Sequence, residues 1–307
     1  MGMRIVVHGQ QAFGKAVLER ILERGENVVG VFCAPDKEGR PADPMKELAL
    51  EKGLPVHQPA SWKTKDAEEL MRSLKPDVCI MAYVLLFVPQ AVLDVPTHGT
   101  FQYHPSLLPD HRGPSSINWP IAMGKTKTGL SIFWPNEGLD EGPILLQKTV
   151  EIGPDETLGE VYFNKLFPLG VEAMIESLEL VKAGKAPKIE QDLTKGSYES
   201  WFKKDLAKAD WAKTAAEVYN TIRAAIPQPA PWTTHKGEQL NILEARKDDS
   251  ASGAPGTVLS VSADGILVAA RMGGILIKRV RAGKGDKMAA SDYAAASGLK
   301  AGDTLGT

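Results

Sequence analysis

An imidazole and a carboxylate that could take part in acyl chemistry occur in two loop-forming stretches of the chain. The first stretch, 100–113 (TFQYHPSLLPDHRG), begins as an apolar strand and breaks at a proline, so His104 lies where the strand gives way to a loop. The second, 136–142 (NEGLDEG), places Asp140 in a glycine-flanked loop between two apolar runs. Side chains on loops that are anchored by strands are common catalytic groups. The two stretches predict a site if the fold brings them together.

The residue types at these positions fit attack on a carbonyl carbon. Such a carbonyl develops negative charge on its oxygen, and it needs a hydrogen-bond donor there and a group that moves the proton. Gln102 and His104 are two residues apart on one predicted strand, so their side chains leave the same face. The Gln102 amide can donate to the oxyanion, His104 can donate or carry a proton, and Asp140 can orient the imidazole or position a nucleophile. The alternatives are a structural histidine, a turn aspartate and a polar sheet side chain.

Other polar residues near this pattern have simpler interpretations. His111 and Arg112 lie in the same loop as His104. A solvated His111 is expected, and an Arg112 that caps the loop is favoured over one that binds an anionic ligand group. The remaining histidines are expected at the surface or at strand ends: His8, His57, His98 and His235.

The segments before and around this pattern alternate between strand and helix. Short apolar runs separated by amphipathic stretches predict a doubly wound, mostly parallel α/β sheet of Rossmann-like type. Strands are expected at 4–9, 27–33, 77–83 and 100–104, and helices at 13–24, 44–52, 64–75, 88–94 and 114–123. A hairpin-like pair over 128–151 and a long helix over 157–183 complete the unit. The first strand–helix turn, 9–14 (GQQAFG), lacks the G-x-G-x-x-G spacing, which disfavours a dinucleotide-binding oxidoreductase.

The last third of the chain has a different pattern. Residues 189–209 are polar and charged, which is typical of a linker, and an amphipathic helix over 212–225 follows. Short strands with tight turns then predict a small OB-like β-barrel. The expected organisation is a catalytic domain at 1–188, a linker at 189–209 and a C-terminal domain at 210–307.

Composition excludes several classes of protein. The chain has 307 residues, of which 43% are hydrophobic, and a formal net charge of −2, so no global charge favours a polyanionic partner. Its two cysteines, Cys33 and Cys79, lie in apolar runs and are expected to be reduced core residues, and no metal-ligand spacing is present. Neither a signal peptide nor an 18-residue apolar segment is found, so we expect a cytoplasmic protein without a membrane partner.

Three blocks of the sequence resemble a known signature. HPSLLPDHRG at 104–113, INW at 117–119 and GLDEGPILLQ at 138–147 are similar in type and order to the folate-dependent formyltransferase family. The resemblance implies 10-formyltetrahydrofolate as cosubstrate, tetrahydrofolate as product, no metal, and catalytic roles for His104 and Asp140. The asparagine of the transferases falls on Gln102, a departure in which a longer amide is still expected to reach the oxyanion.

The resemblance also implies a pterin pocket, formed largely by backbone and apolar groups. Without it, the apolar residues at 85–88 are an ordinary strand-to-helix junction. The implied pocket residues are Leu85, Leu86, Phe87, Val88, Glu137, Gly138, Leu139 and Glu141.

The resemblance leaves the formyl acceptor open. Residues 34–44 and 115–119 resemble the hydrolase domain of 10-formyltetrahydrofolate dehydrogenase, and the loop after the second strand holds two basic and three acidic residues, which suits tRNA poorly. The C-terminal domain resembles the methionyl-tRNA formyltransferases, and 278–287 carries five basic residues and one acidic. We expect transfer to water or a small amine. The alternatives are methionyl-tRNA formylation, formylation of an amino sugar on a nucleotide, and a folate-binding module with little turnover.

Overall fold

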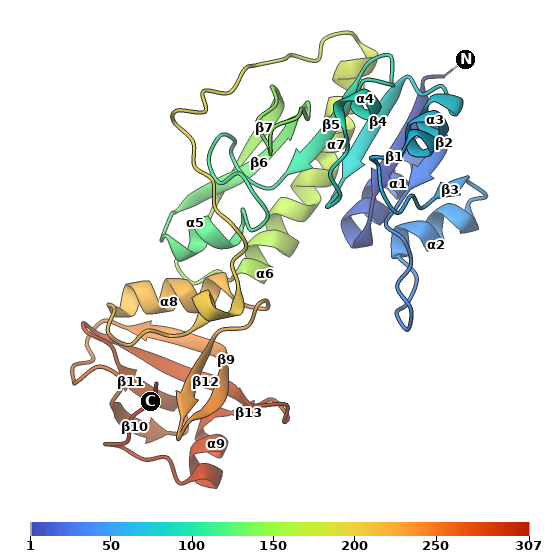
Figure 1. Cartoon of the computed structure of the whole chain (residues 1–307). Coiled ribbons are helices and arrows are strands. Elements are labelled where there is room, and N and C mark those ends of the chain that lie inside the picture. Colours follow the sequence, from blue (N-terminus) through green and yellow to red (C-terminus); the bar gives the residue numbers. More distant parts are fainter. Residues whose placement is uncertain (1, 307) are drawn as a thin grey trace. The chain divides into compact units, whose positions relative to one another are not determined.

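The computed structural model describes residues 2–306, which form two compact units (Figure 1). The first contains the chain up to Gly113 together with Gly129–Val150 and Lys165–Tyr198. The second contains Pro114–Thr128, Glu151–Asn164 and the chain from Glu199 onward. The domain boundaries expected at 188 and 209 remain a prediction.

A seven-stranded sheet forms the centre of the first unit. Its order is β3-β2-β1-β4-β5-β6-β7, in which the pairs from β3 to β5 are parallel and β6 is antiparallel to β5. The strands are β1 (Arg4–Gly9), β2 (Asn27–Phe32), β3 (Val56–His57), β4 (Val78–Ala82), β5 (Thr100–His104), β6 (Lys127–Phe133) and β7 (Ile144–Glu151). The predicted mostly parallel, doubly wound α/β sheet is confirmed.

Helices pack on both faces of this sheet. They are α1 (Gln11–Glu23), α2 (Pro44–Glu51), α3 (Lys65–Ser73), α4 (Gln90–Leu93) and α7 (Phe167–Lys182). In α1, Phe13, Val17 and Ile21 recur at helical spacing and are buried, so one stripe of the helix faces the sheet. Phe13 stacks on Tyr103 of β5 with ring centroids 4.3 Å apart. On the other face, a separate cluster packs Met71 of α3 against the strands.

The helix predicted over 157–183 is interrupted. It consists of α6 (Leu158–Val161), a π-helical turn (Tyr162–Leu166) and α7. The interruption precedes Pro168, which has no N–H to donate to the preceding turn and whose ring crowds the carbonyl four residues earlier. A wider turn at this point accommodates the proline without ending the helical path.

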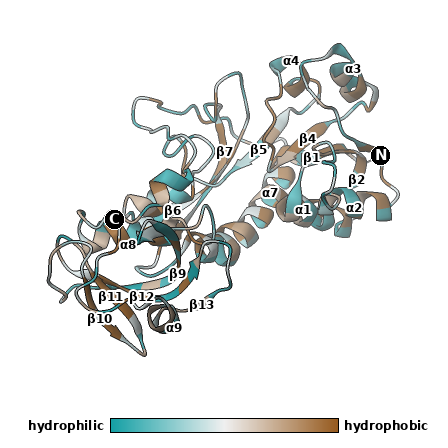
Figure 2. Cartoon of the chain, turned by 60° about the horizontal axis from the view of Figure 1, so that its bottom comes forward, coloured by the Kyte–Doolittle hydropathy of each residue, from teal (hydrophilic) through white to brown (hydrophobic). Residues whose placement is uncertain are grey.

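An antiparallel sheet forms most of the second unit. Its strands are β8 (Trp232–His235), β9 (Glu238–Asp248), β10 (Val258–Ser262), β11 (Gly265–Ala269), β12 (Gly274–Ala282) and β13 (Met288–Ala289). The order is β10-β11-β12-β9-β8, and β13 pairs with β12. In Figure 2, hydrophobic residues cover much of β10 and β11. A tight turn between Ser262 and Gly265 joins these two strands.

The predicted OB-like barrel is not confirmed. Within residues 2–306, β10 and β8 are the two ends of the sheet, and no pairing between them closes it. Barrel closure depends on pairing between strands far apart in the chain, which alternation and turn residues do not encode. The helices of this unit are α5 (Asn118–Ala122), α6, α8 (Ala215–Ala224) and α9 (Ala290–Ser297), with a 3₁₀ turn at Lys204–Ala207.

Both cysteines are buried and free, as predicted. Burial raises the pKa of the Cys79 thiol to about 12, so this side chain stays protonated and has no nucleophilic role at neutral pH. No helix among the described residues is both long and apolar enough to cross a membrane.

Candidate active site

Strand β5 brings the two predicted side chains to one edge of the sheet. Because β4 and β5 are parallel, both end at this edge, and the segments that follow them meet there. Gln102 pairs with Phe133 of the antiparallel strand β6, so the loop that follows Phe133 begins beside β5. This loop contains Asp140. Strand order and register therefore bring the two predicted stretches together.

The imidazole and the carboxylate face each other at the end of β5. His104 Nδ1 lies 3.6 Å from Asp140 Oδ2, which is an ion-pair distance rather than a hydrogen bond. His104 Nε2 lies 3.0 Å from the His111 carbonyl oxygen. A carbonyl can only accept, so Nε2 carries a proton and Nδ1 is the nitrogen directed at the carboxylate. Both side chains are more than nine-tenths buried.

The loop of Asp140 has a constrained backbone. Asp140 itself adopts a left-handed conformation with φ of 57°, and its Oδ2 accepts a hydrogen bond of 2.9 Å from the Gly113 N–H. The base of the loop is closed by Trp134 N–H, which donates to the Pro143 carbonyl oxygen at 2.9 Å. A Cβ on Gly142 would lie 1.8 Å from the Trp134 carbonyl oxygen, so only glycine allows this close approach.

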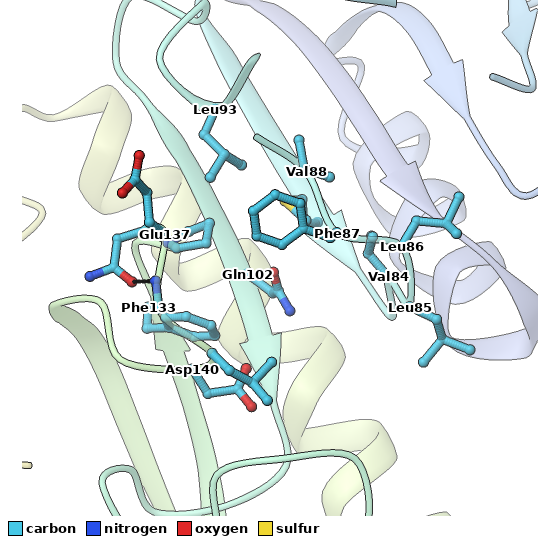
Figure 3. Close-up of a pocket in the computed structure, with 15 residues that line it drawn as sticks. Val84, Leu85, Leu86, Phe87, Val88, Leu93, Gln102, Phe133, Glu137 and Asp140 are labelled. Carbon is cyan, nitrogen blue, oxygen red and sulfur yellow. Dashed lines mark hydrogen bonds between the residues drawn. The ribbon is translucent and has the colours of Figure 1, made fainter. Parts of the chain in front are cut away.

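A pocket of about 210 Å³ lies beside these residues. Figure 3 shows apolar side chains of the 84–88 segment on one side, Phe133 and Glu137 on the other, and the Gln102 amide between them. No hydrogen bond joins the Gln102 side chain to any other residue within 2–306. Leu85, Phe87 and Leu139 line the pocket and are each more than half exposed, an arrangement typical of a ligand site.

Most of the expected pocket residues line this cavity. Leu85, Leu86, Phe87, Val88, Glu137, Gly138 and Leu139 do so, together with Gln102 and Asp140. Glu141 does not: its Oε1 accepts a 2.8 Å hydrogen bond from Arg112 Nη1, so its side chain is directed to the neighbouring loop. The lining also includes residues that the sequence did not single out: Met81, Val84, Leu93, Phe133, Pro135 and Asn136. Except for Leu93, which ends α4, these residues share one signal, since they lie at or just after the ends of β4 and β6.

His111 and Arg112 hold the loop that follows β5. His111 is buried and adopts a left-handed φ of 56°. Its carbonyl oxygen accepts the hydrogen bond from His104 Nε2, and its N–H donates to Ser197 Oγ at 2.9 Å. Arg112 pairs with Glu141. The expectation of a solvated His111 is wrong, because this residue is buried, whereas Arg112 caps the loop with hydrogen bonds to the Ser197 carbonyl oxygen and Glu141, as expected.

Two of the other histidines are buried away from this pair. His8 is the penultimate residue of β1 and packs on Trp62 with ring centroids 4.9 Å apart, and burial lowers the pKa of its imidazole from 6.5 to about 3. His235 ends β8, and its Nδ1 lies 2.7 Å from the Tyr293 hydroxyl. Their strand-end positions match the prediction, but neither is at the surface.

Comparison with known proteins identifies the family to which this chain belongs. A sequence profile of the formyl transferase family matches residues 3–178, and a profile of the formyl transferase C-terminal domain matches 202–298. The chain belongs to the formyl transferase family. Formyltetrahydrofolate is the cosubstrate of this family. Among the described residues, no group of three or more His, Cys, Asp or Glu side chains could hold a metal ion.

Proteins of two kinds resemble the chain in sequence. The human mitochondrial 10-formyltetrahydrofolate dehydrogenase is 38% identical over 243 residues, which cover 78% of this chain and 26% of the relative. The methionyl-tRNA formyltransferase of Trichlorobacter lovleyi is 36% identical over 309 residues, covering 99% of this chain and 97% of the relative. The chain thus spans about a quarter of the dehydrogenase. Related dehydrogenases are named mitochondrial or cytosolic, and a cytoplasmic location for this chain remains a prediction.

Solved structures share the fold of this formyl transferase. HypX from Aquifex aeolicus in complex with tetrahydrofolic acid gives a TM-score of 0.68 at 21% identity, covering 96% of this chain and 47% of HypX. An N-formyltransferase from Helicobacter canadensis gives 0.70 at 17% identity, covering 90% of this chain and 98% of the other.

Proposed function

We propose that this formyl transferase moves the formyl group of 10-formyltetrahydrofolate to water or to a small amine and releases tetrahydrofolate. The observation that carries the proposal is the placement of the His104–Asp140 pair, 3.6 Å apart, beside an apolar pocket of about 210 Å³ into which the unpaired Gln102 amide projects. The pocket is smaller than the roughly 300–1,000 Å³ that complete drug-sized ligands occupy. It suits a ring system whose substituents extend outward.

The pterin ring is proposed to lie among the apolar residues of 85–88 and the 137–139 backbone. An apolar slot with a few polar groups at one end holds a flat heterocycle and fixes its orientation. The N10-formyl group would then point toward Gln102 and Asp140, which line the same pocket. This arrangement places the carbonyl carbon next to the polar end of the site.

The proposed reaction begins with attack of a water or amine lone pair on the formyl carbon. The C=O electron pair moves onto oxygen, where the Gln102 N–H is proposed to donate to the oxyanion. His104 is proposed to add a second donor when Nδ1 is protonated, since its Nε2–H is already bound to the His111 carbonyl oxygen. The tetrahedral intermediate collapses by cleavage of the bond between the carbon and N10, and N10 receives the proton that the nucleophile lost. With water the products are formate and tetrahydrofolate. Asp140 is proposed to take up and return this proton and to orient His104 through Nδ1.

The loop after β2 supports a small acceptor. Asp36 forms an ion pair with Lys46, and Asp43 accepts hydrogen bonds from Met45 N–H and Gln11 N–H, at 2.9 and 2.8 Å, that fix the start of α2. The loop therefore presents no concentration of cations at this edge of the sheet. Phosphate neutralisation dominates nucleic-acid affinity, so this loop contributes little to binding a tRNA.

Methionyl-tRNA formylation is the second candidate. It is favoured by the end-to-end match to methionyl-tRNA formyltransferases and by a groove of the second unit that Arg246, Arg279, Arg281 and Lys287 line. If tRNA is the acceptor, binding should weaken steeply with salt, because each neutralised phosphate releases counterions.

Following the formyl carbon separates the two candidates. The enzyme is incubated with 10-formyltetrahydrofolate labelled in the formyl group, with and without charged initiator tRNA. Label appearing as formate or on a small amine at a rate indifferent to tRNA supports the proposal. Label that moves only when the charged tRNA is present, and moves onto its methionine, establishes the second candidate instead.

A further inference from the structure

The first part of the segment predicted as a linker packs on the active site. Residues 187–198 belong to the first unit, and within them Ile189 exchanges two backbone hydrogen bonds with Ile144 of β7, at 2.8 and 3.0 Å. Two residues later, Gln191 Nε2 donates to the Asp140 carbonyl oxygen at 2.9 Å and to the Gly142 carbonyl oxygen at 2.6 Å. The Gln191 amide thus binds the backbone carbonyl of the proposed catalytic residue, Asp140, and that of the residue two positions later.

We propose that Gln191 is a positioning residue that holds Asp140 in its working orientation. This inference rests on the proposed function, since it assumes that Asp140 takes part in the reaction. Asp140 has a left-handed backbone, which costs an L-residue free energy although aspartate tolerates it better than most, so hydrogen bonds to the loop help to hold it. The Gln191 amide supplies two hydrogen bonds to this loop, at the residue itself and two residues after it. Loss of both bonds lets the Asp140 backbone relax and moves its carboxylate relative to His104.

The same segment holds the other side of the site. Ser197 Oγ accepts from His111 N–H at 2.9 Å, and Ser197 N–H donates to the Pro109 carbonyl oxygen at 3.1 Å. The His111 carbonyl in turn receives His104 Nε2. Residues 189–198 therefore contact the backbone on both sides of the imidazole–carboxylate pair, with Gln191 acting on the carboxylate.

A positioning role predicts effects that a purely structural one does not. If Gln191 acts through Asp140, removing the Gln191 side chain should lower kcat only while the Asp140 carboxylate is present. Substitutions of two residues that act together have non-additive effects on kcat. A structural role would lower stability whatever residue stands at 140. Gln58 offers a matched control, since its Nε2 donates to the Ala34 carbonyl oxygen at 2.7 Å and to Asp36 at 3.2 Å, on a loop away from this pair.

The test is a double-mutant cycle on the full chain. Gln191→Ala is expected to lower kcat for 10-formyltetrahydrofolate turnover by about 10-fold or more with a smaller change in KM, on the scale of a misplaced catalytic group. In an Asp140→Asn background the same change should alter kcat less than about 2-fold. Gln191→Glu keeps the length but sets a carboxylate against two carbonyl oxygens, so it should lose at least as much as Gln191→Ala. Gln58→Ala should leave kcat unchanged.

The outcomes distinguish the positioning role of Gln191 from the proposed role of Asp140. Equal losses from Gln191→Ala in both backgrounds, or an equal loss from Gln58→Ala, overturn the positioning role and leave the proposed function standing. Near-normal turnover by Asp140→Asn overturns the proposed role of Asp140 itself, and the inference about Gln191 with it. Thermal unfolding of each variant confirms that the proteins compared are folded.

Discussion

Two histidines of this protein occupy similar places and differ in what surrounds them. His104 ends β5 and His235 ends β8, and both are buried. His104 faces the Asp140 carboxylate and lies two residues from an unpaired amide that enters a pocket. His235 contacts the Tyr293 hydroxyl, and burial together with the neighbouring Lys236 lowers the pKa of its imidazole.

The difference shows that position at the end of a strand does not by itself give a histidine the neighbours that catalysis needs. Burial and a nearby cation lower the pKa of an imidazole and so favour its neutral form, which suits a structural hydrogen bond. An imidazole between a carbonyl oxygen and a carboxylate, next to space for a ligand, has both a fixed tautomer and a route for a proton. The end of β5 has those neighbours and the end of β8 does not.

Removing each imidazole tests this comparison most directly. His104→Ala is expected to lower turnover of 10-formyltetrahydrofolate by at least ~100-fold, because an acid–base or oxyanion group is lost. His235→Ala should leave turnover nearly unchanged and lower the free energy of unfolding by about 1–3 kcal/mol, because a buried hydrogen bond is lost. Steady-state kinetics and urea unfolding measure both, and near-normal rates in His104→Ala would remove this residue from the mechanism.

The loop that brings the carboxylate to His104 can be displaced without touching either side chain. A Cβ at Gly142 would overlap the Trp134 carbonyl oxygen, so Gly142→Ala is expected to open the base of the loop and lower kcat by about 10-fold. Gly237→Ala, two residues after His235, is the control: Gly237 has a positive φ of 79°, which strains an alanine, but it has open space around its Cβ position. Gly237→Ala should lower the free energy of unfolding and leave kcat unaltered. Equal kcat values for the two variants would contradict the role of the loop.

Shortening the amide beside His104 gives a subtler change. Gln102→Asn is expected to alter the ratio of formate released to formyl transferred to an amine by a few-fold, because the donor to the oxyanion moves by about one methylene. The ratio is measured with labelled 10-formyltetrahydrofolate at several amine concentrations. A constant ratio would show that the length of this side chain has no part in acceptor choice.

His8 extends the comparison to a histidine packed against aromatic rings. The pKa of its imidazole is about 3 in the folded protein and 6.5 when unfolded, so the unfolded chain binds an extra proton between these values. Its contribution to stability is therefore complete above pH 6.5 and is lost as the pH falls, by up to about 1.4 kcal/mol per pH unit. Urea unfolding between pH 5 and 7 should show a flatter pH dependence for His8→Leu than for the unmodified protein. Parallel curves of unfolding free energy against pH for the two proteins would contradict a lowered pKa of His8.

Local patterns predicted the sheet and the pair at its edge, because those features are encoded locally. Alternating strand and helix patterns, and the signature around His104 and Asp140, need only neighbouring residues to be recognised. Gln191 and Ser197 were not predicted, since a polar segment that binds backbone carbonyls has the composition of a linker. The contact of Glu141 with Arg112 joins two loops, and no spacing rule encodes it.

The packing of residues 189–198 has a practical consequence for protein engineering. Sequence composition suggests cutting the chain at about residue 188, where polar residues begin. A fragment or chimera divided there would keep the imidazole, the carboxylate and the pocket. It would lose the hydrogen bonds by which Gln191 and Ser197 hold the loops of Asp140 and His111. Any graft of this chemistry onto a new scaffold should carry the chain through Tyr198.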